Sequence, residues 1–303
     1  MSPPPDRTPA QPPQAKIIRG TGPGKSNPIE TWRIEAGTSV CEVAPSRGGI
    51  VTRFSVDGDE ILYMDGATLR DRSQKVRGGI PVLFPIAGAL NGDRFTVGGR
   101  SFALRQHGLA RQAAWSVHSV GGARLVLEFR STPATLASFP FDFIYRLAID
   151  IEHAGYRSLV LDSEFENCGR EPMPLHYGFH PYFQVADAAK PRTRVDIPAK
   201  RLLDNHTGER GDWRGEIDYS ASIQDLHLTE LHGNTITLDI PGKPRRTLTF
   251  SESYSQIVVW TTALKDFICI EPWSAPADAL NTGIGLHTIA PGEIHRASFT
   301  IAV

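Results

Sequence analysis

The sequence predicts an all-β protein, a large antiparallel β-sandwich, and three observations lead to that fold class. Apolar residues alternate with polar ones at a period of two in several segments, as expected of strands with one buried face. Turn residues separate these segments, and no segment of helical periodicity lies between them, which favours a sandwich over alternating strands and helices. The 28 glycines and 23 prolines among 303 residues also indicate many short elements joined by turns.

Each expected element has its own pattern along the chain. Leu125, Leu127 and Phe129 alternate with more polar neighbours and predict a strand over 125–129, and a short helix is expected over 133–138. Every odd residue from Phe143 to Ile151 is apolar, which predicts a strand with one core face. The same alternation predicts strands over 236–240 and 299–303, and more continuous apolar runs predict buried strands over 256–260 and 267–271. Turns are expected at 121–122, 167–169, 241–242 and 291–292.

The length alone allows two domains, at about 150 residues per domain. However, no linker rich in Pro, Gly or Ser divides the chain after its first residues. We therefore expect a single domain over residues 16–303. The Pro-rich, polar residues 1–15 are expected to form a disordered tail.

Charge and composition argue against several classes of function. The 32 Lys and Arg residues nearly balance 33 Asp and Glu residues, so that no overall field attracts nucleic acid or an anionic membrane. The N-terminus lacks the apolar region of a signal peptide, and the longest nearly apolar run, 80–90, is too short to cross a bilayer. We expect a soluble cytoplasmic protein whose Cys41, Cys168 and Cys269 are buried, reduced thiols.

Two segments place a polar residue beside glycine. In Arg77-Gly-Gly-Ile-Pro81 the glycines allow backbone conformations closed to other residues, so that Arg77 could present its planar guanidinium to oxygen ligands. The alternative is a solvent-facing arginine before a turn. In His107-Gly-Leu-Ala-Arg111, the glycine allows close approach to the backbone beside His107, although a lone histidine is more often structural.

The segment 176–183 holds two histidines among aromatic residues. His176 and His180 are four residues apart, but prolines and a glycine interrupt a helix there, so no metal site is expected. Aromatic rings suit the apolar face of a sugar, with His180 supplying proton chemistry. The rings in question belong to Tyr177, Phe179, Tyr182 and Phe183.

Glu271 closes the apolar strand over 267–271. It shares one face of that strand with Phe267 and Cys269, and the following Pro272 is expected to end the strand. A carboxylate against so apolar a surface should have a raised pKa, which suits general acid–base work. The alternative is a glutamate that has emerged into solvent.

Taken in order, these four segments resemble the aldose 1-epimerase (galactose mutarotase-like) family, including its hexose-6-phosphate mutarotase branch. The segments at Arg77 and His107 are most similar to that branch, whereas 178–183 and Glu271-Pro-Trp273 are similar to galactose mutarotases. The resemblance covers about residues 48–303. It implies a β-supersandwich, a curved antiparallel two-layer fold whose concave face holds the sugar.

The resemblance also implies a role for each candidate residue. His180 corresponds to the general acid and Glu271 to the general base, acting from opposite sides of the sugar. His107 and Arg77 correspond to substrate-binding residues, and Asp204 is a candidate for the aspartate that contacts sugar hydroxyls. The implied activity is that of an aldose 1-epimerase, which needs no metal or cofactor; we expect a small-molecule sugar as partner and a monomer or homodimer.

Three alternatives remain open at this stage. The third and fourth segments favour a neutral aldose, while the cations near Arg77 keep a hexose 6-phosphate close behind. A non-catalytic carbohydrate-binding sandwich would have no use for an acid–base pair. A glycoside hydrolase would need two carboxylates about 5–9.5 Å apart, and only Glu271 stands in a convincing motif.

Overall fold

The structure is a computed structural model that describes residues 15–21, 29–151 and 154–303. In this part of the chain, every pair of named strands is antiparallel, which confirms the predicted all-β class. The tail predicted over 1–15 lies outside the described residues except for Ala15. Among the described residues, no helix is long and apolar enough to cross a membrane.

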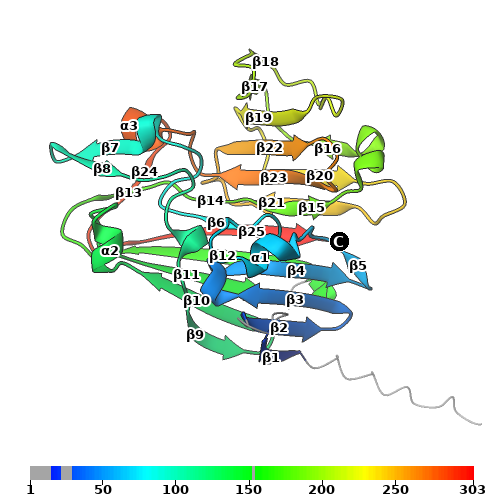
Figure 1. Ribbon diagram of the computed structural model, residues 1–303, viewed down its shortest axis with the longest axis horizontal. Helices are drawn as coiled ribbons and strands as arrows, with labels where there is room; N and C mark the ends of the chain where they lie inside the picture. Colours follow the sequence, from blue (N-terminus) through cyan, green and yellow to red (C-terminus); the bar gives the residue numbers. More distant parts are fainter. Residues whose placement is uncertain (1–14, 22–28, 152–153) are drawn as a thin grey trace, which may run out of the picture.

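Three large sheets make up most of the molecule (Figure 1). The N-terminal sheet contains, in order, β1 (Lys16–Thr21), β2 (Glu30–Ala36), β3 (Ser39–Ala44), β4 (Ile50–Val56) and β5 (Asp59–Glu60). The back sheet contains β16 (Arg194–Asp196), β20 (Thr235–Asp239), β21 (Arg246–Phe250), β25 (Ile294–Ala302), β12 (Ser158–Asn167), β11 (Phe143–Asp150), β10 (Arg124–Arg130) and β9 (Ser116–Gly121).

The third sheet, called the site sheet below, carries most of the candidate residues. It contains β18 (Arg210–Asp212), β17 (Arg201–Asp204), β19 (Ile223–Thr229), β22 (Gln256–Thr262), β23 (Phe267–Trp273), β14 (Gly178–Phe179) and β6 (Val82–Leu83), with β15 (Tyr182–Gln184) also paired to β23. Two ribbons complete the strands: β7 (Arg94–Val97) with β8 (Arg100–Ala103), and β13 (Met173–Leu175) with β24 (His287–Ile289).

Helices are short and lie in the connections. The α-helices are α1 (Gly66–Arg70), α2 (Pro133–Leu136) and α3 (Ala279–Thr282), and α2 confirms the short helix expected over 133–138. Single 3-10 segments occur at Pro45–Arg47, Asn91–Asp93, Ala110–Gln112, Ala154–Tyr156 and Asp187–Arg192.

The sheets are arranged in two layers. Figure 1 shows the N-terminal sheet next to the site sheet. Isolated bridges from Val51 to Ile80 and from Leu62 to Phe183 connect the segments of the two sheets. The back sheet forms the other layer, and one hydrophobic core includes the inward faces of both layers. That core extends from Ile34 to Ile301, so the alternation in the sequence does separate core residues from solvent-facing ones.

Strand β23 is longer than expected. Its Ile268 and Ile270 enter the core between the layers, while Phe267 and Cys269 pack on the opposite face, as predicted. The prediction that Pro272 ends the strand is wrong, because neighbouring strands continue past it. Pro272 faces Ile257 of β22, and Trp273 faces Gly178 of β14. Glu271 is therefore held inside the sheet rather than at a strand end.

The cysteine prediction holds only in part. All three cysteines are free thiols. Cys41 and Cys269 are buried, but Cys168 is exposed, because the turn that follows β12 carries it away from the sheet. The expectation that all three are buried is wrong for this residue.

Candidate active site

One cavity of about 320 Å³ over the site sheet brings together four of the five candidate residues. Arg77, His107, His180 and Glu271 all line it, although they come from distant parts of the chain. The other lining residues include Lys75, Gln106, Arg111, Asn205, Asp225, His227, Val258, Trp260 and Trp273. Histidines, carboxylates and cations therefore meet in a single concave site.

Glu271 lies on the floor of this cavity, within a row of side chains that crosses three strands. The pairing register places His227 of β19 opposite Val258 of β22, and Val258 opposite Glu271 of β23. The Glu271 side chain is almost fully buried, and its Oε2 accepts a hydrogen bond of 3.1 Å from Nε1 of Trp273. Strand pairing on both sides thus fixes the position of this carboxyl group.

His180 occupies the short link between β14 and β15. Its backbone amide donates to the Pro81 carbonyl at 3.0 Å, and its ring stacks on Tyr182 with centroids 4.7 Å apart. Its Nε2 lies 3.2 Å from Oε1 of Glu271. The two groups are direct neighbours here, whereas the sequence predicted an acid and a base on opposite sides of a sugar.

Burial moves the two pKa values in opposite directions. It raises the pKa of Glu271 well above the usual 4.5, with the charge of Asp225 adding to the effect. It lowers the pKa of His180 well below 6.5, and the nearby Arg111 charge lowers it further. Because each group is driven toward its neutral form, one proton shared across the 3.2 Å contact satisfies both.

His107 has a defined tautomer because of a backbone contact. Its Nδ1 accepts a hydrogen bond from the amide of Gly88 at 3.1 Å, which leaves the proton of the neutral ring on Nε2. Burial, followed by the charge of Arg111, lowers the pKa of His107 well below 6.5, so the ring is neutral at neutral pH. His107 is therefore a hydrogen-bond donor in the wall of the cavity.

Gly108 explains how the chain can place His107 there. Its φ is +69°, and a Cβ at this position would lie 2.4 Å from the Phe84 carbonyl oxygen. Only glycine fits such a close parallel approach of two backbones. The glycine beside His107 has the structural purpose that the sequence suggested.

Three cations, Lys75, Arg77 and Arg111, line the cavity. Within the described part of the chain, none of them forms an ion pair with a carboxylate. Arg77 lies over the ring of Trp260, with its guanidinium carbon 5.6 Å from the ring centroid. Burial lowers the pKa of Lys75, and the charges of Arg111 and Arg77 lower it further. Positive charge is therefore concentrated in the cavity without a direct ion pair to a carboxylate among the described residues.

Asp204, the fifth candidate, does not line the cavity. Its Oδ1 instead accepts hydrogen bonds from the backbone amides of His206 and Thr207, which shapes the turn after β17. The expectation that Asp204 contacts the sugar is therefore not supported by its position. The carboxylate that does line the cavity is Asp225.

Asp225 and His227 are functional candidates that sequence reasoning missed. The carboxylate of Asp225 accepts from Asn205 at 2.8 Å and contacts Nε2 of His227 at 3.2 Å. Burial acts to raise the pKa of Asp225, but these two hydrogen bonds outweigh it and lower the pKa below the usual 3.8. The available signal was the alternation in β19, where both residues fall on the face opposite Leu226 and Leu228.

The aromatic residues expected to hold a sugar are placed differently. Each of those in 177–183 is at least 99% buried and none lines the cavity, so the interpretation of that segment as a sugar platform is wrong. Tyr177, Phe179 and Phe183 belong to the main hydrophobic core between the layers. Trp260 and Trp273 supply the aromatic surface of the cavity instead.

His180, Cys269 and Glu271 form a possible metal-ligand group among the described residues, with ligand atoms within 4.8 Å of one another. Cys269 is buried behind the wall and does not line the cavity. Burial also raises the pKa of its thiol, which disfavours the thiolate that a metal needs. The arrangement fits acid–base chemistry better than a metal centre.

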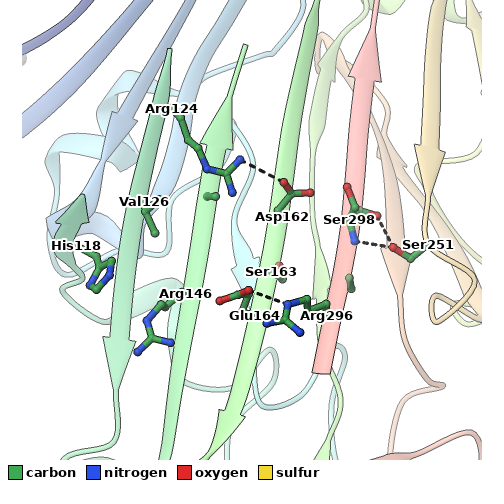
Figure 2. A pocket seen from close by; sticks show the side chains of 12 residues that line it. His118, Arg124, Val126, Arg146, Asp162, Ser163, Glu164, Ser251, Arg296 and Ser298 are labelled. Atoms are coloured by element: carbon green, nitrogen blue, oxygen red, sulfur yellow. Dashed lines mark hydrogen bonds and ion pairs between the residues drawn. The ribbon is translucent and has the colours of Figure 1, made fainter. Parts of the chain in front are cut away.

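A second hollow, of about 430 Å³, lies on the outer face of the back sheet (Figure 2). Its charges are already paired: Arg296 contacts Glu164 at 2.8 Å, and Arg124 contacts Asp162 at 3.4 Å. Such pairs leave no free charge to recognise a ligand or shift a pKa. The smaller cavity over the site sheet, with its unpaired cations and buried acid–base pair, is the candidate active site.

Comparisons with known proteins agree with this fold. The family model described as aldose 1-epimerase matches residues 30–302. A protein of Cenchrus ciliaris with the provisional name glucose-6-phosphate 1-epimerase is 25% identical over 281 residues, which are 84% of this chain and 79% of that protein. Among solved structures, the Slr1438 protein of Synechocystis sp. PCC 6803 is 35% identical and superposes with a TM-score of 0.86. The match covers 90% of this chain and 94% of the Slr1438 chain.

A more distant structure has the same architecture. Galactose 1-epimerase from Lactobacillus acidophilus NCFM superposes with a TM-score of 0.72 at 13% identity, over 96% of this chain and 98% of that one. The fold is thus the galactose mutarotase-like sandwich that the resemblance implied.

Proposed function

The chain belongs to the aldose 1-epimerase family, and we propose that it interconverts the α and β anomers of an aldohexose by acid–base ring opening and closure. The observation that carries this proposal is the 3.2 Å contact between His180 Nε2 and Glu271 Oε1, inside the cavity and almost without solvent. The contact pairs an acid with a base whose pKa values are moved toward each other by burial. A binding module would not need such a pair.

The adjacency of the two groups suits the reaction. The hydroxyl oxygen and the ring oxygen of an aldose are both bonded to C1, so one compact acid–base pair reaches both. Burial favours the shared proton on Glu271. Once that proton passes to His180, the Glu271 carboxylate removes the C1 hydroxyl proton and a C1–O double bond forms. The bond between C1 and the ring oxygen breaks, and His180 delivers its proton to the ring oxygen.

The pair then holds its proton on Glu271, which is the state that ring closure requires. After rotation about the C1–C2 bond, the chain hydroxyl attacks the other face of the aldehyde. His180 takes up the hydroxyl proton, and Glu271 returns a proton to the new C1 hydroxyl. Protons and electrons balance over the cycle, and no metal or redox cofactor enters it. His107 Nε2 donates toward substrate oxygen and stabilises the developing charge.

The cations favour a hexose 6-phosphate over a neutral hexose. Lys75, Arg77 and Arg111 have no carboxylate partner in the described chain, and phosphate oxygens would supply one. A phosphate cannot be on C1, because the anomeric hydroxyl must be free, so another carbon of the sugar must carry it. This reverses the order suggested by the motifs, which favoured the neutral aldose.

The deciding experiment compares anomer exchange for glucose, galactose and glucose 6-phosphate by NMR saturation transfer. We expect kcat/KM for glucose 6-phosphate to exceed that for glucose by tenfold or more. Equal values would assign the protein to neutral aldoses. No exchange with any of them would favour a carbohydrate-binding protein, and release of an aryl group from an aryl glycoside would favour a hydrolase.

A further inference from the structure

Residues 45–49 lie outside the cavity but contact both parts of the chain that carry its cations. We propose that this segment, called the 45–49 brace below, is a positioning element that sets the affinity of the site for a phosphate group. The proposal rests on the proposed function, since it concerns the phosphate end of the same substrate. Its residues do not line the cavity, so they would act through Lys75, Arg77 and Arg111.

Arg47 connects the brace to the loop that presents Lys75 and Arg77. Its side chain is about nine-tenths buried, and Nη2 donates to three backbone carbonyls, those of Thr68 at 3.1 Å, Asp71 at 3.0 Å and Gln74 at 3.2 Å. Among the described residues no carboxylate forms an ion pair with it. A buried guanidinium that binds only carbonyls fixes the course of a backbone.

The same loop passes this constraint on to Arg77 through Thr68. While the Thr68 carbonyl accepts from Arg47, the Thr68 hydroxyl oxygen accepts from the Arg77 amide at 2.9 Å. The Arg77 carbonyl in turn accepts from the Asp65 amide at 2.9 Å. Two hydrogen bonds through one residue therefore link the guanidinium of Arg47 to the backbone of Arg77.

Gly48 connects the brace to the third cation, Arg111. A Cβ on Gly48, whose φ is +87°, would lie 2.3 Å from the Arg111 carbonyl oxygen, and the Gly48 amide donates to Ala113 at 2.9 Å. Nη2 of Arg111 then donates to the Val76 carbonyl at 3.3 Å, between Lys75 and Arg77 in the sequence. The brace thus holds the loop and Arg111 together from one side.

This arrangement answers a physical problem of the site. Three like charges close together repel one another: burial lowers the pKa of Lys75, and the charges of Arg111 and Arg77 lower it further. No carboxylate among the described residues forms an ion pair with them, so contacts through the backbone are the ones observed to hold them. Cations fixed before binding cost less ordering when phosphate arrives, whereas free cations would spread toward solvent.

The test uses the full-length protein with Arg47→Met, which keeps the apolar bulk but removes the donors, and with Arg47→Lys. Arg53→Met is the control, since Arg53 lies on β4 but pairs with Glu60 rather than with the loop. Thermal unfolding of each variant shows that the compared samples are folded. The readouts are KM and kcat for glucose 6-phosphate and for glucose, and binding of inorganic phosphate by calorimetry.

We expect Arg47→Met to raise KM for glucose 6-phosphate about tenfold, consistent with a charge-assisted contact, with kcat and the glucose KM changed less than threefold. Arg47→Lys should recover part of the affinity, and Arg53→Met should match the wild type. An equal rise of KM for both sugars, a fall in kcat alone, or an unchanged phosphate affinity would overturn the proposal.

The two proposals fail in distinguishable ways. If the wild type does not prefer glucose 6-phosphate to glucose, the phosphate part of the proposed function fails. The brace is then judged on inorganic phosphate alone: weaker binding by folded Arg47→Met than by the wild type supports it. Unchanged binding, or no binding by the wild type, rejects it.

Discussion

Glu271→Gln is the substitution that most directly tests the acid–base pair. Glutamine has nearly the shape of glutamate, and its side-chain oxygen can still accept from Nε1 of Trp273, which now lies 3.1 Å from the carboxylate. It cannot accept a proton from the C1 hydroxyl. The substitution therefore removes the proposed base while leaving the shape of the cavity in place.

Loss of a positioned acid or base costs about 10²–10⁴-fold in rate, or about 2.7–5.4 kcal/mol of barrier. The structure favours the upper part of that range. Glu271 is only 1% exposed, so solvent cannot supply a substitute base. The other carboxylate that lines the cavity is Asp225, whose pKa is held below 3.8 by His227 and Asn205, which makes it a weak base. We expect a loss of at least 10³-fold in kcat.

The assay is the rate of α-to-β exchange, measured by polarimetry or NMR saturation transfer after subtraction of the spontaneous rate. Glu164→Gln is the matched control, because Glu164 pairs with Arg296 on the outer face of the back sheet (Figure 2). A folded Glu271→Gln protein that keeps more than a tenth of the wild-type rate would refute the assignment of Glu271 as the base.

Three further predictions follow from the same geometry. The profile of kcat/KM against pH should be bell-shaped. Activity should fall at low pH once both groups of the pair are protonated, through a pKa below the usual 6.5 of histidine, and at high pH once both are deprotonated, through a pKa above the usual 4.5 of glutamate. A flat profile between pH 4 and 9 would contradict this prediction. Asp225→Asn should lower kcat/KM by about tenfold or more, through lost contact with sugar and with His227, and should leave the unfolding temperature nearly unchanged; full activity would remove Asp225 from the site. Gly108→Ala should destabilise the fold by at least about 1–2 kcal/mol from backbone strain alone. Gly92→Ala, with a similar φ of +61° and open space around it, should lower the free energy of unfolding by less, as measured by a denaturation curve. Equal losses for the two variants would contradict the close approach at Gly108.

The sequence anticipated the residues whose position follows from local geometry. The face of Glu271 follows from the period of two along its own strand, and burial of the neighbouring residues follows from the same pattern. His107 was recognisable because the neighbouring glycine allows an unusual backbone, and His180 because it stands among glycine, proline and aromatic residues. These constraints act within a few residues, so they can be read from a short segment.

What the sequence could not give depends on pairing between distant segments. Asp225 and His227 alternate with apolar residues as plainly as Glu271 does, but their face becomes the cavity floor only because β19 pairs with β22 and β22 with β23. Asp204 stands beside a turn signal in the sequence, and its carboxylate accepts hydrogen bonds from the backbone of that turn. The aromatic residues of 177–183 were misplaced because rings near a histidine serve a core as well as a sugar.

The site divides its tasks between two kinds of backbone. Strands carry the proposed base, Glu271, and the floor residues Asp225 and His227, where sheet hydrogen bonds leave little freedom. Loops carry Lys75 and Arg77, which are proposed to recognise phosphate, and loops can shift without breaking a sheet. A substitution in the strands should therefore lower kcat for every aldose, whereas one in the loops should change which aldose is preferred. We therefore expect separate effects: substitutions in the strands of the site sheet should change kcat, and substitutions in the loops should change the relative KM values of different aldoses.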